Sequence, residues 1–127
     1  MVNDMAVAGR EREVMVVEDD VAIRETLREV LEDRGYRVVG AANGVEALAS
    51  LRGRTPSLIL LDLAMPVMDG LEFRDVQRSD PELARIPVVI ISADHGGENE
   101  ASRLAVEGYL AKPFELDALL ATVDRYC

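Results

Sequence analysis

Five short apolar runs along the chain predict five β-strands. They cover residues 14–17, 36–41, 58–61, 87–91 and 109–111. Short apolar runs bounded by turn residues are typical of strands that are buried on both faces. The clearest run is 58–61, where the apolar residues end abruptly at Asp62.

The segments between these runs predict helices. Residues 21–34 repeat apolar side chains three and four positions apart, and Gly35 then ends the predicted helix. Further helices are expected over 45–51, from 69–70 to about 78, and, as a short piece, near 100–105. The last helix begins near Leu116 and has apolar residues at 119, 120 and 123.

Strands that alternate with helices predict an α/β fold. Such a chain forms parallel strands joined by right-handed crossovers, with helices on both faces of one sheet. Residues 1–12 are small and polar and are expected to form a flexible N-terminal tail, whereas 13–127 form a single domain.

Charge and composition narrow the function classes. The net charge of −10 disfavours direct binding to nucleic acid or to an anionic membrane, because both would repel the protein. The chain has one cysteine, no signal peptide and no apolar run of the roughly 20 residues that span a bilayer. A cytoplasmic protein is therefore expected.

Carboxylates follow two of the predicted strands. Glu18, Asp19 and Asp20 follow the first strand, and Asp62 ends the third. Ligands of open parallel sheets bind at the carboxyl ends of the strands, where the strand order reverses. If the first and third strands are neighbours, these carboxylates face each other and repel unless a cation joins them. Oxygen ligands favour Mg²⁺.

Two other strand ends carry groups that suit a phosphate. Ser92 ends the fourth strand with a hydroxyl group, and Lys112 follows the fifth with a mobile positive charge. A carboxylate nucleophile, metal ligands, a hydroxyl group and a lysine together predict phosphoryl transfer onto an aspartate.

Four motifs at these strand ends resemble the response-regulator receiver domains of two-component signalling. The motifs are EDD, LDLAMPVMDG, ISA and YLAKPF, in this order along the chain. The resemblance covers roughly residues 13–126. It implies a flavodoxin-like, doubly wound sheet of five parallel strands in the order 2-1-3-4-5. It also implies a sensor histidine kinase or phosphotransfer protein as partner.

The resemblance also implies roles for the acidic residues. Asp62 corresponds to the phosphoacceptor, which takes the phosphoryl group from a phosphohistidine. Asp19 and Asp20 correspond to Mg²⁺ ligands, directly or through water. Ala64 occupies the position whose backbone carbonyl binds the metal, and it also tunes the lifetime of the phosphoryl group in the family, as does the position of Asp94.

Further roles are implied beyond the acidic residues. Ser92 corresponds to the hydroxyl that turns toward the new phosphoryl group, and Lys112 to its charge partner. Tyr109 corresponds to the aromatic residue whose rotamer follows the switch. The peptide bond between Lys112 and Pro113 is usually cis in the family.

Each residue also has a simpler interpretation. Asp20 alone could cap the helix that starts at Val21, and Asp62 could cap its loop. Ser92 alone would be a turn residue, Lys112 a surface charge and Tyr109 ordinary packing. The motifs together favour the signalling roles.

The chain departs from the family pattern between Ser92 and Lys112. This stretch is about two residues shorter than usual and contains Gly96-Gly97, which disfavours helix, so the fourth helix is expected to be short or irregular. This face is therefore not expected to pair in the way usual for the family, and a monomer or weak dimer is expected. Ala105-Val106 also stands where the family often has Gly-Ala.

Two other functions also use parts of this pattern. A hydrolase of the haloacid dehalogenase type needs a second aspartate at position 64, where this chain has Ala64. A receiver-like interaction module without phosphorylation stays a minor alternative. The sequence leaves open the kinase, the downstream effector, and whether the domain stands alone or belongs to a longer regulator.

Overall fold

A computed structural model describes residues 12–65, 67–92 and 105–127. Five parallel strands form one sheet in the order β2-β1-β3-β4-β5. They are β1 (Glu13–Val17), β2 (Arg37–Ala41), β3 (Leu58–Asp62), β4 (Val88–Ser92) and β5 (Gly108–Ala111). This order confirms the predicted flavodoxin-like arrangement.

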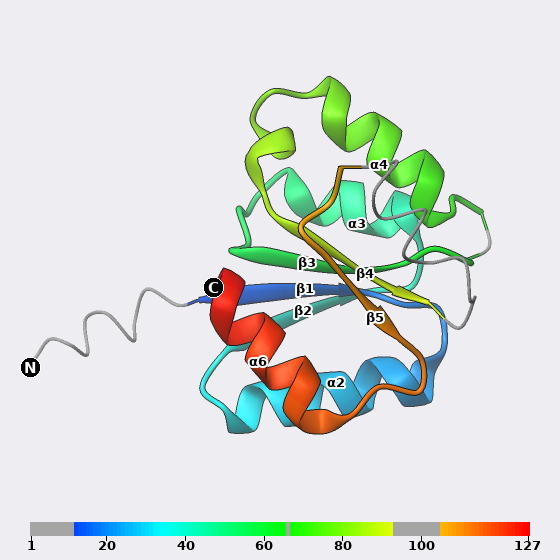
Figure 1. The fold of residues 1–127 in the computed structure, drawn as a ribbon. Helices are drawn as coiled ribbons and strands as arrows, with labels where there is room; N and C mark the ends of the chain where they lie inside the picture. Colours follow the sequence, from blue (N-terminus) through cyan, green and yellow to red (C-terminus); the bar gives the residue numbers. More distant parts are fainter. Residues whose placement is uncertain (1–11, 66, 93–104) are drawn as a thin grey trace, which may run out of the picture.

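Four α-helices of the described residues cover the two faces of the sheet (Figure 1). Helices α2 (Val21–Asp33) and α6 (Leu116–Tyr126) lie on one face, and α3 (Gly44–Leu51) and α4 (Gly70–Ser79) lie on the other. A short 3₁₀ turn, η1 (Leu83–Arg85), follows α4 and was not predicted.

The sheet separates two apolar layers because successive strand residues point to opposite faces. Val14 and Val16 of β1 join the layer under α2 and α6, whereas Met15 and Val17 join the layer under α3 and α4. All residues of β3 and β4 are buried. The continuous apolar runs of the sequence therefore belong to strands that are covered on both faces.

Most predicted boundaries agree with the structure to within about two residues. Gly35 follows α2 with a φ of 99°, a left-handed conformation that glycine adopts without strain. The predicted short helix at 100–105 lies outside the described residues except for Ala105. Ala105 itself forms a turn with a φ of 55°.

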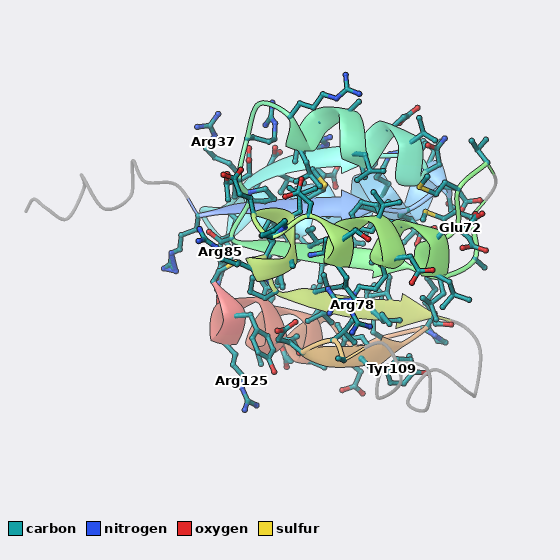
Figure 2. The ribbon with its side chains drawn as sticks, turned by 90° about the horizontal axis from the view of Figure 1, so that it is seen from above. Arg37, Glu72, Arg78, Arg85, Tyr109 and Arg125 are labelled. Carbon is teal, nitrogen blue, oxygen red and sulfur yellow. The ribbon has the colours of Figure 1, made fainter. Side chains whose placement is uncertain are left out.

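Parallel strands place all their carboxyl ends at one edge of the sheet (Figure 1). Arg37, Arg85 and Arg125 lie at the opposite end of the molecule (Figure 2). Arg125 is in the last turn of α6, where a positive charge complements the helix dipole. No described helix has the length and apolarity to cross a membrane.

Candidate functional site

Six of the predicted site residues line one pocket at the carboxyl edge of the sheet: Asp19, Asp20, Asp62, Ala64, Ser92 and Lys112. β1 and β3 are neighbours, so the two acidic segments face each other across their ends. The pocket has a volume of about 470 Å³. Its lining comprises Glu18, Asp19, Asp20, Ile23, Asp62, Ala64, Ser92 and Lys112.

Three carboxylates lie together in this pocket. One oxygen each from Glu18, Asp19 and Asp62 fall within 4.8 Å of one another. Glu18 is 1% exposed, and its buried Oε1 makes no aligned hydrogen bond with any described residue. Lys112 Nζ, 2.7 Å from this oxygen, is a single positive charge beside three carboxylates. The cluster therefore fits a divalent cation, which would supply further positive charge and bind carboxylate oxygens.

Asp20 has a different position from the other two acidic residues of its segment. Its Oδ1 accepts a hydrogen bond from the backbone N–H of Ile23 (3.1 Å), so Asp20 is the N-cap of α2. It lines the pocket but is not one of the three clustered carboxylates. The capping alternative is therefore realised, and a role of Asp20 in binding metal stays a prediction.

Glu18 was not predicted as a metal ligand from the sequence. Its backbone N–H still donates to the carbonyl of Ala41 (2.9 Å), so the backbone pairing of β1 extends through this residue. One signal in the sequence could have identified Glu18. Asp20 lies directly before a helix, which is the usual place for an N-cap, so Glu18 and Asp19 were the two acidic residues free to point into the crevice.

Asp62 is 4% exposed at the end of β3. Burial raises the pKa of its carboxyl to about 7, and the nearby charge of Glu18 adds to the rise. Lys112 and the backbone N–H of Ala64, which donates to Asp62 Oδ1 (3.2 Å), oppose this rise in pKa. The carboxylate is therefore held in a site that favours neutralisation by a cation.

Lys112 is the single lysine of the chain. Its Nζ lies 2.7 Å from Glu18 Oε1 and 3.5 Å from Asp62 Oδ2. Burial lowers the pKa of Lys112, but hydrogen bonds and charges from the two carboxylates outweigh burial and raise the pKa above its ordinary value. The backbone N–H of Lys112 donates to the carbonyl of Ser92 (2.8 Å), and the bond to Pro113 is cis, as expected.

The predicted switch residues lie on adjacent strands. Ser92 is buried at the end of β4 and lines the pocket. Tyr109 is half-buried on the edge strand β5, where it pairs in register with Ile90 and packs against it (Figure 2). Asp94 lies outside the described residues.

The loop from β3 to α4 is held by backbone contacts. A Cβ on Gly70 would lie 2.6 Å from the carbonyl oxygen of Asp62, so only glycine allows this approach. Asp69 caps α4 and forms a reciprocal capping box with Glu72. Val67 has a φ of 68° and is 79% exposed, which is unusual for a β-branched residue.

Comparisons with known proteins agree with this geometry. The polar-differentiation response regulator DivK of Brucella anthropi is 33% identical over 117 residues, which cover 91% of this chain and 95% of that protein. The chemotaxis response regulator CheY4 of Vibrio cholerae has a TM-score of 0.84 at 33% identity, covering 92% of this chain and 99% of that one.

A second similar structure contains a metal ion. The receiver domain of the sensor histidine kinase PA1611 from Pseudomonas aeruginosa has a magnesium ion coordinated in its active-site cleft. It has a TM-score of 0.83 at 28% identity and covers 91% of this chain and 97% of that one. The sequence model described as "Response regulator receiver domain" matches residues 14–124. This protein therefore belongs to the family of response regulator receiver domains.

Proposed function

We propose that this receiver domain accepts a phosphoryl group on Asp62 from a phosphohistidine of a sensor histidine kinase or phosphotransfer protein. The observation that carries the proposal is the meeting of Asp62 with two further carboxylates and one lysine in a single pocket. A carboxylate nucleophile beside a metal site and a fixed cation is suited to phosphoryl transfer.

The transfer would exchange one bond to phosphorus for another. An oxygen of Asp62 attacks the phosphorus atom, the bond from phosphorus to the histidine nitrogen breaks, and the imidazole keeps that electron pair. The product is an aspartyl phosphate, which water later hydrolyses to inorganic phosphate. In this way the domain promotes its own phosphorylation and dephosphorylation without acting on a separate substrate.

The metal in this proposal is Mg²⁺. Glu18, Asp19 and Asp62 would hold it through carboxylate oxygens, and Ala64 through its backbone carbonyl. The bound ion would supply positive charge to the phosphoryl oxygens. Asp20, which caps α2, would contribute through water at most.

Other groups of the pocket would bind the transferred phosphoryl group. Lys112 would pair with its oxygens, and the hydroxyl of Ser92 would donate a hydrogen bond to one of them. Movement of Ser92 would change the packing of Tyr109 on the neighbouring strand and thus alter a protein-binding surface. Ala64 and Asp94 would set the access of hydrolysing water and the lifetime of the product.

The phosphodonor would contact an apolar groove beside the pocket. This groove is lined by Ala22, Ile23, Thr26, Leu27, Lys112, Pro113 and Phe114 and has a volume of about 450 Å³. It shares Ile23 and Lys112 with the acidic pocket. An apolar face of a donor helix placed there would bring its phosphohistidine to Asp62. Apart from these contacts, we propose a monomer or weak dimer that does not bind nucleic acid or membranes.

The test is phosphorylation by a small-molecule donor. The protein is incubated with acetyl phosphate and Mg²⁺, and its intact mass is measured beside an Asp62→Asn variant. One added phosphoryl group in the wild type, absent from the variant and absent without metal, is expected. If no adduct forms, phosphate release from acetyl phosphate is followed over time. Release that requires Asp62 indicates a short-lived adduct, whereas no release indicates an unphosphorylated interaction module.

A further inference from the structure

Arg24 connects α2 to the segment that carries two of the clustered carboxylates. Its guanidinium donates a hydrogen bond from Nη1 to the carbonyl of Glu18 (2.6 Å), and the same nitrogen lies 3.5 Å from the carbonyl of Asp19. The side chain thus binds the backbone of these two residues, while their carboxylates point toward Asp62.

The stem of Arg24 lies across a glycine of the neighbouring strand. A Cβ on Gly40 of β2 would lie 3.2 Å from Arg24 Cδ and 3.5 Å from Cγ. Such distances show that the stem is packed closely on the backbone of β2. Arg24 is therefore fixed at both ends, by its stem on Gly40 and by its guanidinium on the segment after β1.

The hydrogen bonds of Arg24 hold the segment after β1 in place against the repulsion between the clustered carboxylates. Three carboxylates within 4.8 Å repel one another, and the segment that follows β1 could relax to separate them. Hydrogen bonds from Arg24 to the two carbonyls oppose that relaxation. Groups that orient ligands from behind raise the affinity of a site for metal because the ligands are already in place.

We infer that Arg24 is a positioning residue that holds Glu18 and Asp19 ready for a divalent cation, with Gly40 providing the room for its side chain. The inference rests on the proposed function of the acidic pocket as a metal site. Arg24 touches neither the metal nor the phosphoryl group in this arrangement.

Charge and positioning make opposite predictions for Arg24→Gln. As a positive charge near a cation site, Arg24 would repel Mg²⁺, so its removal would strengthen binding. As a positioning residue, its removal weakens binding. The sign of the change in affinity therefore separates the two accounts.

Arg28→Gln is the matched control. Arg28 lies one turn further along α2, and its Nη2 would be 3.0 Å from the same added Cβ on Gly40. Its guanidinium instead donates to the carbonyl of Val38 (3.0 Å), away from the acidic pocket. The control removes the same charge and similar packing without touching the segment after β1.

Two quantities are measured on the whole chain. The first is the dissociation constant for Mg²⁺ by titration calorimetry. The second is amide hydrogen exchange in the metal-free protein, read at Asp20, whose N–H donates to Glu18 Oε2 (3.1 Å). For Arg24→Gln we expect roughly tenfold weaker Mg²⁺ binding and faster exchange at Asp20, and for Arg28→Gln no more than about a twofold change in either. Gly40→Ala is the second variant. Its added Cβ would crowd both the Arg24 stem and the Arg28 guanidinium but would remove neither charge. It is expected to weaken binding by a smaller factor than Arg24→Gln, and Arg28→Gln shows how much of that loss comes from Arg28.

Several results would overturn the inference. These are unchanged or tighter Mg²⁺ binding by Arg24→Gln, or an equal loss in Arg28→Gln. A wild-type protein with no affinity for Mg²⁺ would instead refute the proposed function. In that case exchange at Asp20 still decides whether Arg24 orders this segment, because that measurement needs no metal.

Discussion

The ammonium group of Lys112 lies nearer to Glu18 than to Asp62. The distances from Nζ are 2.7 Å to Glu18 Oε1 and 3.5 Å to Asp62 Oδ2. Glu18 therefore both pairs with the lysine and belongs to the carboxylate cluster. The glutamate that precedes the two aspartates is thus as central to the pocket as the candidate phosphoacceptor.

Single substitutions in the acidic segment should identify the metal ligands. We expect Glu18→Gln and Asp19→Asn each to weaken Mg²⁺ binding by at least roughly 10- to 100-fold. This is the loss that follows when a residue orienting a metal ligand is removed. Asp20→Asn should change it by no more than about threefold, and asparagine caps helices as well as aspartate does, so α2 is kept. Titration calorimetry measures all three. An equally large loss in Asp20→Asn would assign Asp20 as a ligand.

The stability of the metal-free protein should depend on the ionisation of Asp62. Its pKa is about 7 in the folded protein against 3.8 as the ordinary value, so the folded state holds a proton that the unfolded chain has lost between these pH values. The contribution of Asp62 to the free energy of unfolding therefore falls as pH rises from about 4 to about 7.

Asp62→Asn removes this ionisation, so its stability relative to the wild type should rise with pH through the same window. We expect an advantage of roughly 2 kcal/mol at pH 8, about half of what the pKa shift implies, because the neighbouring charges readjust. Urea unfolding with chelator at pH 4.5 and pH 8 measures it. Excess Mg²⁺ should stabilise the wild type more than Asp62→Asn, which has lost one of the three clustered carboxylates. A pH-independent difference between the two proteins would contradict the prediction.

Two residues in left-handed conformations should each cost stability. Ala105 and Val67 have φ values of 55° and 68°, where side chains are disfavoured. Ala105→Gly and Val67→Gly should each increase the free energy of unfolding by about 0.5–1 kcal/mol. Ala121→Gly is the control, because Ala121 lies in the regular helix α6. This variant should lower the free energy of unfolding by about 1 kcal/mol. Denaturant unfolding measures these free energies. A lower free energy of unfolding in Ala105→Gly or Val67→Gly would contradict the prediction.

Gly70 should not tolerate a side chain. A Cβ there would lie 2.6 Å from the carbonyl oxygen of Asp62 and 2.8 Å from Leu63 Cα, and both are backbone atoms that cannot turn aside. We expect Gly70→Ala to lower the free energy of unfolding by about 2–3 kcal/mol and to slow the phosphorylation of Asp62.

Gly53→Ala is the control, because an added Cβ at Gly53 meets nothing within 4 Å. It should leave phosphorylation unchanged and change stability by less than about 1 kcal/mol. Thermal unfolding and intact-mass kinetics are measured for both variants. Normal kinetics in Gly70→Ala would show that the loop can shift without harm to the site.

A hydrogen bond from Arg74 to the carbonyl of Ala105 stabilises this turn, where alanine adopts a left-handed conformation that favours glycine. Arg74 is buried on α4, and its Nη2 donates a hydrogen bond to the carbonyl of Ala105 (2.9 Å). Its Nη1 donates to Gln77 Oε1 (2.7 Å), and Gln77 in turn donates to the carbonyls of Leu83 and Ile86. A buried network of this kind holds the turn that leads into β5.

The sequence by itself determined the sheet, its covering helices and the edge at which the site lies. The short apolar run of 58–61, bounded by turn residues, indicated a strand covered on both faces, and parallel strands must bring their carboxyl ends to one edge. Asp62, Ser92 and Lys112 follow from their places at strand ends. These conclusions depend on local patterns and on the topology that the patterns impose.

Tertiary structure decided which carboxylates meet. Glu18 and Asp20 have the same charge and lie two residues apart, but one follows the strand into the pocket and the other turns to cap α2. The support from Arg24 and the network of Arg74 were equally absent from the sequence pattern. Both depend on which backbone carbonyl an arginine guanidinium reaches once its helix has packed on the sheet. The spacing of residues along the chain does not determine that contact.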